Sequence, residues 1–301
     1  MEFSQIVFLV NDLSRSGRRT ADAVNTYMKV KNIPYRIIKV IGSAFDLESF
    51  IKENPQTLYV IAGGDGSLNY YITYLEERNI DVPISYLATG SGNDFARSLG
   101  IPRSDIEAGL DYIFSLRDTR EFSVIKATAA NETFYAINSL GFGIDAWANK
   151  KIGESPRAVK RILGSNIYLL EVVPSFFDMT PRHVQVIIED EVHDYYNSIL
   201  AIVVNNAYFG GGIKIHPTAT AFDEEFKIIV LDDIKLSDIP GIVKPLLTDQ
   251  THLNHPKFHT FSASNFKLNI LEEEYGQKDG ELIDKNIYSL EVERHERSFW
   301  I

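Results

Sequence analysis

Two glycine-rich stretches carry small residues and carboxylates in a spacing that suits phosphate chemistry. The first, Gly63-Gly-Asp-Gly-Ser67, follows the apolar residues 58–62 and precedes a helix-like stretch. Glycines at a strand-to-helix turn let backbone N–H groups approach phosphate oxygens, and a helix N-terminus favours an anion. A carboxylate beside phosphates would repel them unless it held Mg²⁺ or moved a proton, so Asp65 indicates phosphoryl transfer. The alternative is a glycine turn in which Asp65 caps the helix.

The second stretch, Gly90-Ser-Gly-Asn-Asp-Phe-Ala-Arg97, follows a predicted strand at residues 84–87 and again leads into a short helix-like segment. Asn93 and Asp94 suit a helix N-cap, with Arg97 as a surface partner of the aspartate. The recurrence of such a loop after two successive predicted strands favours ligand binding over capping alone. Neither stretch contains the Gly-Lys pair of a Walker A loop or the GxGxxG pattern of a dinucleotide-binding fold.

The elements that must position these loops follow two different patterns. Up to about residue 120, β-branched runs alternate with helix-length segments, which predicts a parallel sheet covered on both faces, with ligands beyond the carboxyl ends of its strands. Those stretches are residues 6–10, 20–31, 36–41, 47–52 and 58–62. Farther along, closely spaced strands predict an antiparallel sandwich. They are residues 133–138, 183–188, 198–204, 226–231, 265–270 and 287–292.

The change of pattern predicts two domains. An α/β domain is expected over residues 1–122 and a β-rich domain over residues 123–290. We expect the tail, residues 291–301, to pack back on the first domain. Residues 156–177 are the one long helical stretch expected in the second domain.

Composition narrows the classes of partner and site. The 301 residues include 30 Lys and Arg against 41 Asp and Glu, a formal net charge of −11, which disfavours nucleic acid as a partner. The absence of cysteine excludes disulfides, thiolate metal sites and thiol nucleophiles, and fits a reducing cytoplasm. We expect no signal peptide. Because no apolar run reaches the roughly 18 residues of a membrane-spanning helix, any membrane contact is expected to be peripheral.

The two glycine stretches together resemble the paired signatures of the diacylglycerol kinase catalytic family, soluble bacterial lipid kinases related to sphingosine and ceramide kinases. Further matches follow in family order along most of the chain. They are the stretch from Asn11 to Gly17, Gly141-Phe-Gly-Ile-Asp-Ala146, the segment from Asn205 to Pro217, and Lys278-Asp-Gly-Glu281. The resemblance implies that the first domain is a nucleotide-binding, Rossmann-like α/β domain of the NAD kinase and diacylglycerol kinase type. It implies that the second is a β-sandwich-like domain for the lipid substrate, with the nucleotide between the two.

The resemblance also implies an ATP- and Mg²⁺-dependent lipid kinase that phosphorylates the hydroxyl of diacylglycerol or a related glycerolipid. The implied nucleotide-binding residues are Asn11, Gly63, Gly64, Asp65, Gly66, Ser67, Asn69, Ser91, Asn93 and Asp94. The general-base role falls on Asp279, supported by Glu281, and the implied metal ligands are Asp65, Asp94 and Asp223. Such chemistry needs a carboxylate to accept the proton of the attacking hydroxyl and Mg²⁺ to neutralise phosphate charge.

Two other functions fit parts of the sequence. An NAD kinase-like enzyme would share the Gly-Gly-Asp-Gly loop, although the second loop and the late Asp-Gly-Glu favour the lipid branch. A non-catalytic lipid or nucleotide sensor of the same fold is the other. It is motivated by Ser123, where the family usually has an aspartate, and by Glu224, where a glycine is usual.

Two clusters outside these motifs have a functional and a structural interpretation. Positive charges gather ahead of an apolar stretch, at Lys150, Lys151, Arg157, Lys160 and Arg161. They suit docking on an anionic membrane surface, and a helix with a solvated basic end explains them equally well. His252, His255 and His259 are spaced closely enough for a metal site, and a polar loop also accounts for them. The sequence carries no signal for an oligomeric state.

Overall fold

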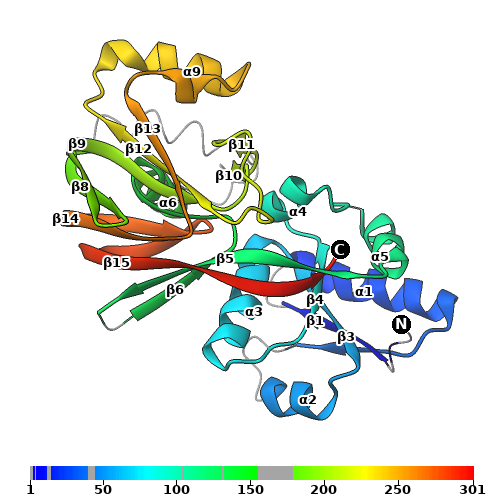
Figure 1. Cartoon of the computed structure of the whole chain (residues 1–301). Helices are drawn as coiled ribbons and strands as arrows, with labels where there is room; N and C mark the ends of the chain where they lie inside the picture. The colour runs from blue at the N-terminus through cyan, green and yellow to red at the C-terminus, as the bar shows by residue number, and fades with distance from the viewer. Residues whose placement is uncertain are drawn as a thin grey trace. The chain divides into compact units, whose positions relative to one another are not determined.

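The computed structural model describes residue 3 and residues 5–11, 15–39, 45–103, 105–130, 132–154 and 179–301. The chain divides into two compact units, the first formed by Met1–Phe122 with Glu296–Ile301 and the second by Ser123–His295. Both boundaries fall inside strands, β5 (Thr119–Ala129) and β15 (Glu281–Trp300) (Figure 1). The helix expected over residues 156–177 lies outside the described residues.

The first unit is built on a parallel sheet. Its strands lie in the order β2-β1-β3-β4, and the end of β15 joins β4 in parallel through the pair Phe299 and Ile84. Its other elements are β1 (Gln5–Val10), α1 (Arg15–Lys31), β2 (Tyr35–Ile38), α2 (Leu47–Glu53), β3 (Thr57–Gly63), α3 (Asp65–Glu77), β4 (Ile84–Ala88), α4 (Asp94–Leu99) and α5 (Ile106–Ser115). This arrangement confirms the predicted α/β sheet.

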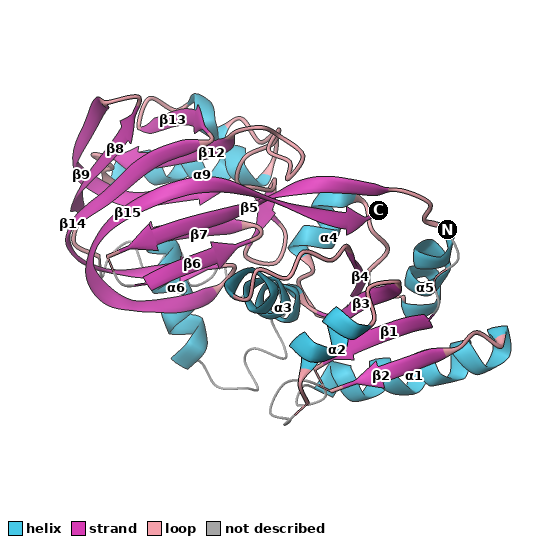
Figure 2. Cartoon of the chain, turned by 60° about the horizontal axis from the view of Figure 1, so that its bottom comes forward, coloured by secondary structure: helices cyan, strands magenta, loops and turns pink. Residues whose placement is uncertain are grey.

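Helices cover both faces of this sheet, as the continuous apolar strands predict. On one face, Phe8 and Val60 pack in a core with residues of α1 and α5, whose Tyr27 and Phe114 rings stack at 5.9 Å. Figure 2 shows α1 running along β1 and β2. On the other face, α3 contacts β3 and buries Leu68, among others. Every residue of β3 and β4 is buried, so the sheet rigidly fixes where its strand ends lie.

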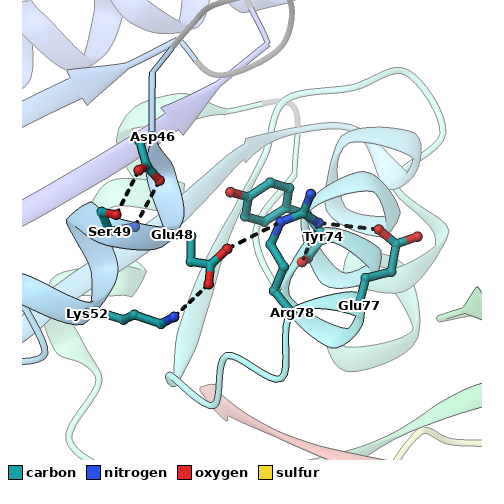
Figure 3. Close-up of polar contacts among 7 residues, drawn as sticks. All are labelled: Asp46, Glu48, Ser49, Lys52, Tyr74, Glu77 and Arg78. Atoms are coloured by element: carbon teal, nitrogen blue, oxygen red, sulfur yellow. Dashed lines mark hydrogen bonds and ion pairs between the residues drawn. The ribbon is translucent and has the colours of Figure 1, made fainter.

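Exposed polar side chains join α2 to the end of α3 (Figure 3). Asp46 caps α2 by accepting the backbone N–H of Ser49 at 3.0 Å. The guanidinium of Arg78, at the end of α3, lies 3.9 Å from the centre of the Tyr74 ring and 3.8 Å from a carboxylate oxygen of Glu48 in α2. Exposed ion pairs of this kind contribute about 0–1 kcal/mol each, so they orient α2 more than they stabilise the unit.

The second unit is strand-rich, and its strands pair mainly in antiparallel ladders. Two long strands, β9 (Glu191–Val204) and β14 (Asn265–Lys278), each pair with two shorter ones. Their first halves pair with β8 (Arg182–Ile188) and their second halves with β7 (Ser139–Gly143). Their side chains enclose an apolar core that includes Phe142, Leu268 and Leu290. This confirms the predicted antiparallel, sandwich-like domain.

The remaining elements of the second unit follow in chain order. They are β6 (Glu132–Ala136), β7 (Ser139–Gly143), α6 (Ile144–Glu154), β8 (Arg182–Ile188), β9 (Glu191–Val204), β10 (Tyr208–Phe209), β11 (Ile213–Lys214), β12 (Phe226–Asp232), η2 (Leu236–Asp238), α9 (Ile239–Leu247), η3 (His252–Asn254), β13 (Phe258–Ala263) and β14 (Asn265–Lys278). Among them, β14 and β15 form a hairpin whose turn carries Asp279.

Candidate functional site

In the first unit, the predicted phosphate-binding residues follow three adjacent strands. Asn11 comes directly after β1, Gly63 ends β3, and Ala88 ends β4. The ladder pairs Val10 with Ala62 and Gly63 with Ala88, so these strand ends lie side by side at the carboxyl edge of the sheet. After β1, the chain forms β2 on one side of β1 and then returns to form β3 on its other side. Ligands of open α/β sheets bind at such a switch point.

The two glycine loops touch each other at this edge. A Cβ atom on Gly90 would lie 2.4 Å from the Cα of Gly64, and the carbonyl oxygen of Gly63 accepts the backbone N–H of Thr89 at 2.8 Å. Only glycine permits this approach, because a side chain at either contact would push the loops apart. The contact holds both loops beside the N-terminus of α3, where backbone N–H groups suit an anion.

The side chain of Asn93 stabilises the second loop through hydrogen bonds within it. Its backbone is left-handed, with φ of 53°, a conformation that asparagine tolerates. Its amide donates to the carbonyl of Gly90 at 2.7 Å and accepts the N–H of the same residue at 3.1 Å. The buried hydroxyl of Tyr86 donates to the carbonyl of Gly63 at 3.2 Å, and burial beside Asp65 raises its pKa well above the usual 10. Tyr86 therefore remains a hydrogen-bond donor.

The carboxylate of Asp65 caps the helix of the neighbouring loop. It accepts the backbone N–H of Asp94 at 2.8 Å and that of Phe95 at 3.1 Å, so it binds the N-terminus of α4. Asp94 is itself buried, with Arg97 3.6 Å away. An ionised carboxylate offers about four acceptor positions, so two backbone bonds are compatible with an additional metal contact.

The other predicted residues of the first unit surround this contact. The side chain of Ser67 lies where a Cβ on Gly63 would be, at 2.5 Å. Asn69 is buried in α3, Gly66 lies in its first turn, and Ser91 is exposed in the second loop. The first unit thus gathers every predicted nucleotide-binding residue at the ends of β1, β3 and β4.

In the second unit, Asp279 sits in a two-residue hairpin turn between β14 and β15. Asp279 and Gly280 both have positive φ, 48° and 88°, and the flanking Lys278 and Glu281 pair with each other. Asp-Gly is a favoured sequence for such turns, because both central residues must be left-handed. Glu281, the predicted supporting carboxylate, is exposed on β15.

The carboxylate of Asp279 is held by three consecutive backbone N–H groups. Ile137 donates at 2.8 Å, Asn138 at 2.7 Å and Ser139 at 3.0 Å, while the N–H of Asp279 donates to the carbonyl of Ser139 at 3.0 Å. These bonds connect the β14–β15 turn to the β6–β7 turn. They fix the side chain's position and give it a structural role in addition to any chemistry.

Two buried asparagines after β9 support the β6–β7 turn from the other side. Asn205 donates to the carbonyls of Ser123 at 2.6 Å and Ile137 at 2.8 Å. Asn206 donates to the Ile137 carbonyl at 2.9 Å and accepts the N–H of Ala221 at 3.1 Å. The Asn205 segment matched by the family resemblance thus has a structural explanation, because it positions the backbone that holds Asp279.

A buried network that sequence reasoning missed lies next to this turn. Gln277 donates to Asp145 at 2.9 Å and to the hydroxyl of Ser139 at 3.2 Å, and accepts the N–H of Gly280 at 2.8 Å. Burial raises the pKa of Asp145 from its usual 3.8 to about 7, although the Gln277 bond opposes the shift. Asp145 belongs to the stretch from Gly141 to Ala146 that resembles the family, but nothing in the sequence indicates that it meets Gln277.

The predicted metal ligand Asp223 lies in a turn of its own. Its carboxylate accepts the N–H of Thr220 at 3.3 Å, and its carbonyl accepts the hydroxyl of Ser123, to which Arg294 donates at 2.7 Å. Within the described part of the chain, no group of three or more His, Asp or Glu residues is arranged to hold a metal ion. Mg²⁺ at kinase sites needs only one or two carboxylates plus phosphate oxygens, so Asp65 and Asp94 remain suitable ligands.

Two further sequence features have been located. The ring of His252 contacts the carbonyl of Ile215 at 2.8 Å, and that of His259 packs on Tyr195, so each belongs to local packing. Lys150 pairs with Glu154 at 3.5 Å. The rest of the basic cluster, Arg157, Lys160 and Arg161, lies outside the described residues. No helix in the described ranges is long and apolar enough to cross a membrane.

Comparisons with known proteins identify the family of this chain. Residues 5–127 match the model of the diacylglycerol kinase catalytic domain, and residues 138–293 match that of the YegS C-terminal NAD kinase beta sandwich-like domain. The chain belongs to the diacylglycerol kinase catalytic family. The two matches cover the parts of the chain that carry the glycine loops and the Asp279 turn.

Relatives in this family are similar along most of their length. A diacylglycerol kinase of Bacillus subtilis is 25% identical over 224 residues, covering 74% of this chain and 71% of that protein. A Klebsiella pneumoniae protein named as a probable YegS-like lipid kinase is 26% identical. The match covers 96% of this chain and 93% of that protein. The crystal structure of a diacylglycerol kinase from Bacillus anthracis superposes with a TM-score of 0.73 at 18% identity, covering 100% and 98%. This structure shares the fold.

Proposed function

We propose that this chain transfers the γ-phosphate of ATP to the hydroxyl of a lipid, with diacylglycerol or a related glycerolipid as the acceptor. The observation that carries the proposal is the contact between Gly64 and Gly90, which brings two glycine loops together at the switch point of a parallel sheet. Family membership and the names of the relatives support the same reaction class.

The phosphate-binding role belongs to the first unit. The loops after β3 and β4 meet through two glycines, and the N-terminus of α3 beside them suits the oxygens of a triphosphate. Asp65 and Asp94 are the carboxylates suited to bind Mg²⁺, together with phosphate oxygens. When bound, Mg²⁺ neutralises the charge that develops on the transferred group.

The base role belongs to Asp279 in the second unit. Phosphoryl transfer passes through a loose transition state, in which the protein mainly positions the nucleophile, so a carboxylate is a sufficient base. The three backbone bonds hold the Asp279 carboxylate in one orientation toward the acceptor hydroxyl. Glu281 follows in the same hairpin and adds negative charge nearby.

A non-catalytic sensor is the second candidate, favoured by one specific observation. Both carboxylates assigned to chemistry already have structural partners, because Asp65 caps α4 and Asp279 binds three backbone N–H groups. A protein that only binds nucleotide or lipid would keep these aspartates for folding alone. Turnover separates the two functions.

The test is a transfer assay with γ-labelled ATP and a panel of acceptors, namely diacylglycerol, phosphatidylglycerol, a long-chain base and NAD, with Mg²⁺ or with EDTA. Label in a lipid, dependent on Mg²⁺, is the expected result. Label in NAD alone would assign the NAD kinase function. ATP binding without transfer to any acceptor would assign the sensor function.

The lipid acceptor places the reaction at a membrane surface, to which the basic cluster from Lys150 to Arg161 is proposed to bind. Each Lys or Arg near an anionic surface contributes about 1 kcal/mol, so binding should weaken with salt. Co-sedimentation with phosphatidylglycerol vesicles tests this, using a variant with Lys150, Lys151, Lys160 and Arg161 changed to Gln. Unchanged sedimentation of the variant would assign the cluster to a solvated helix end.

A further inference from the structure

The turn that carries Asp279 contacts the side chain of Gln277, to which neither the family motif nor the proposed mechanism assigns a role. Gln277 is 1% exposed, and each polar group of its amide has a partner. The nitrogen donates to Asp145 at 2.9 Å and to the Ser139 hydroxyl at 3.2 Å, and the oxygen accepts the N–H of Gly280 at 2.8 Å. A carboxylate on one side and an N–H on the other fix which way the amide faces.

Gln277 contacts the Asp279 turn in two ways, through Gly280 in the turn itself and through Ser139, which binds Asp279. Gly280 is the second central residue of the hairpin turn. Ser139 supplies both an N–H to the Asp279 carboxylate and a carbonyl to the Asp279 N–H, and its hydroxyl accepts from Gln277. One amide therefore contacts the residue after Asp279 and a residue that binds its carboxylate.

Asp145 anchors the other end of this amide. It is buried at the start of α6, and its second oxygen accepts the N–H of Ala146 at 2.8 Å. A Cβ on Gly141 would lie 1.9 Å from the Asp145 carboxylate and 3.0 Å from the Gln277 nitrogen. The absence of a side chain at Gly141 therefore allows Asp145 and Gln277 to meet.

We infer that Gln277, anchored by Asp145, is a positioning residue that holds the Asp279 carboxylate in its working orientation. The inference rests on the proposed function, in which Asp279 is the base. Loss of the amide frees the Gly280 and Ser139 contacts and lets the carboxylate shift. A shift of about 1 Å at a reacting group can cost about 10²-fold in rate.

The first test is Gln277→Leu, compared with Gln185→Leu as a matched control. Gln185 also donates to an aspartate, Asp194, at 2.9 Å in the same unit, but this pair is exposed. We expect Gln277→Leu to lower kcat for lipid by about 10²-fold and to leave the KM for ATP unchanged, because the phosphate loops are elsewhere in the chain. The control should keep both values. A kcat within a few-fold of wild type in Gln277→Leu overturns the inference.

The second test exchanges the two groups. Gln277→Glu places two carboxylates against each other and should lose activity. Adding Asp145→Asn restores an amide facing a carboxylate, with a carboxylate oxygen still available to the Gly280 N–H. We expect the double variant to recover kcat by at least about ten-fold over the single one, within the coupling range of contacting residues. No recovery, or a double variant that does not fold, overturns the inference even if Gln277→Leu is unfolded.

A third measurement does not depend on activity. Amide hydrogen exchange at residues 137–139 and 280 should be at least about ten-fold faster in Gln277→Leu and unchanged in Gln185→Leu, because local opening follows lost contacts. If wild type phosphorylates no lipid, the proposed function fails, and this measurement still decides whether Gln277 holds the turn. Equal exchange in both variants shows that it does not.

Discussion

The carboxylate of Asp65 lies 2.8 Å from the backbone nitrogen of Asp94, so the aspartate of the first glycine loop caps the helix that begins in the second. The two predicted alternatives for Asp65, chemistry and capping, are therefore not exclusive. Capping connects the two loops, and Asp65 lies just beyond the carboxyl end of β3, beside the switch point of the sheet. A substitution that removes the charge but keeps one of the two capping acceptors separates the two roles, provided that activity is measured on the folded variant.

Asp65→Asn is that substitution. Asparagine keeps one acceptor oxygen for the N-terminus of α4, but its NH₂ group would face the second backbone N–H, so we expect a lower melting temperature. If Asp65 organises Mg²⁺, turnover should fall and its Mg²⁺ dependence should change. Asp105→Asn is the matched control, because Asp105 caps α5 through the N–H of Ala108 at 3.1 Å and is exposed. If Asp65→Asn shows the Mg²⁺ dependence of the wild type, Asp65 has no role in metal binding and only caps α4.

Gly90→Ala tests the contact between the loops. The added methyl carbon would lie 2.4 Å from Gly64 and must push the loops apart. We expect ATP affinity, measured by calorimetry, to fall at least about ten-fold, since loop backbones no longer converge on the phosphates. Gly153→Ala in α6 is the control, because nothing lies within 4 Å of its Cβ, and it should bind ATP as wild type does. Equal affinities in the two variants would exclude the loops from phosphate binding.

The buried pair of Arg297 and Glu76 anchors the C-terminal strand in the first unit. The guanidinium donates to Glu76 at 2.5 Å and to the carbonyl of Ile80 at 2.8 Å, and both side chains are buried. Arg297→Met strands a buried carboxylate and should cost about 3–5 kcal/mol in the free energy of unfolding. Arg78→Met, which removes an exposed cation, should cost about 1 kcal/mol or less. Urea unfolding of both variants gives the comparison.

A second variant identifies the cause of the Arg297 effect. Arg297→Met combined with Glu76→Leu removes both charges, so much of the lost stability should return. If the double variant is no more stable than Arg297→Met alone, the loss comes from packing of the arginine stem rather than from an uncompensated charge.

Asp145 should make stability fall as the pH rises. Its pKa in the folded protein is about 7, against 3.8 in the unfolded chain, because burial penalises the charged form, with the Glu274 charge adding to the shift. Below about pH 4 both states are protonated. Between pH 4 and 7 only the unfolded chain loses the proton, so each pH unit removes up to about 1.4 kcal/mol of stability. Above pH 7 the effect is complete.

Asp145→Asn removes this titration. The difference in free energy of unfolding between wild type and variant should therefore shift in favour of the variant from pH 5 to pH 8, by a few kcal/mol. Urea unfolding at several pH values measures it, and comparing the two proteins cancels the titration of other groups. A constant difference across this range would show that Asp145 is ionised in the folded protein throughout.

Sequence patterns predicted the parts of the fold that depend on local composition. Continuous apolar runs predicted the buried parallel strands, and β3 differs from the expected residues 58–62 by one residue at each end. The long strands were only half predicted. β9 begins at Glu191 rather than residue 198, and its first half is hard to predict because all of its residues are exposed or only partly buried. That half pairs mainly with β8.

The candidate site was predictable where a motif is continuous along the chain and not where the fold assembles it. The glycine loops and the Asp-Gly turn are local signals. Asp145 and Gln277 lie 132 positions apart, and only the pairing of β7 with β14 brings them together. The backbone N–H groups that hold Asp279 have no side-chain signature at all. No spacing rule within one sequence can reveal such contacts.

Asp279→Asn gives the sharpest test of the base, and the structure changes what to expect from it. An asparagine keeps one acceptor oxygen, but its NH₂ group would face backbone N–H groups of residues 137–139, which now bind the carboxylate. We therefore expect a lower melting temperature as well as a turnover at least about 10²-fold lower, with the KM for ATP close to wild type. Asp190→Asn is the control, because Asp190 also occupies a hairpin turn at positive φ, 67°, between β8 and β9. Assays well below the melting temperature of each variant separate the loss of base from the loss of folded protein. If folded Asp279→Asn phosphorylates lipid within a few-fold of wild type, Asp279 serves the hairpin alone, and another group accepts the proton.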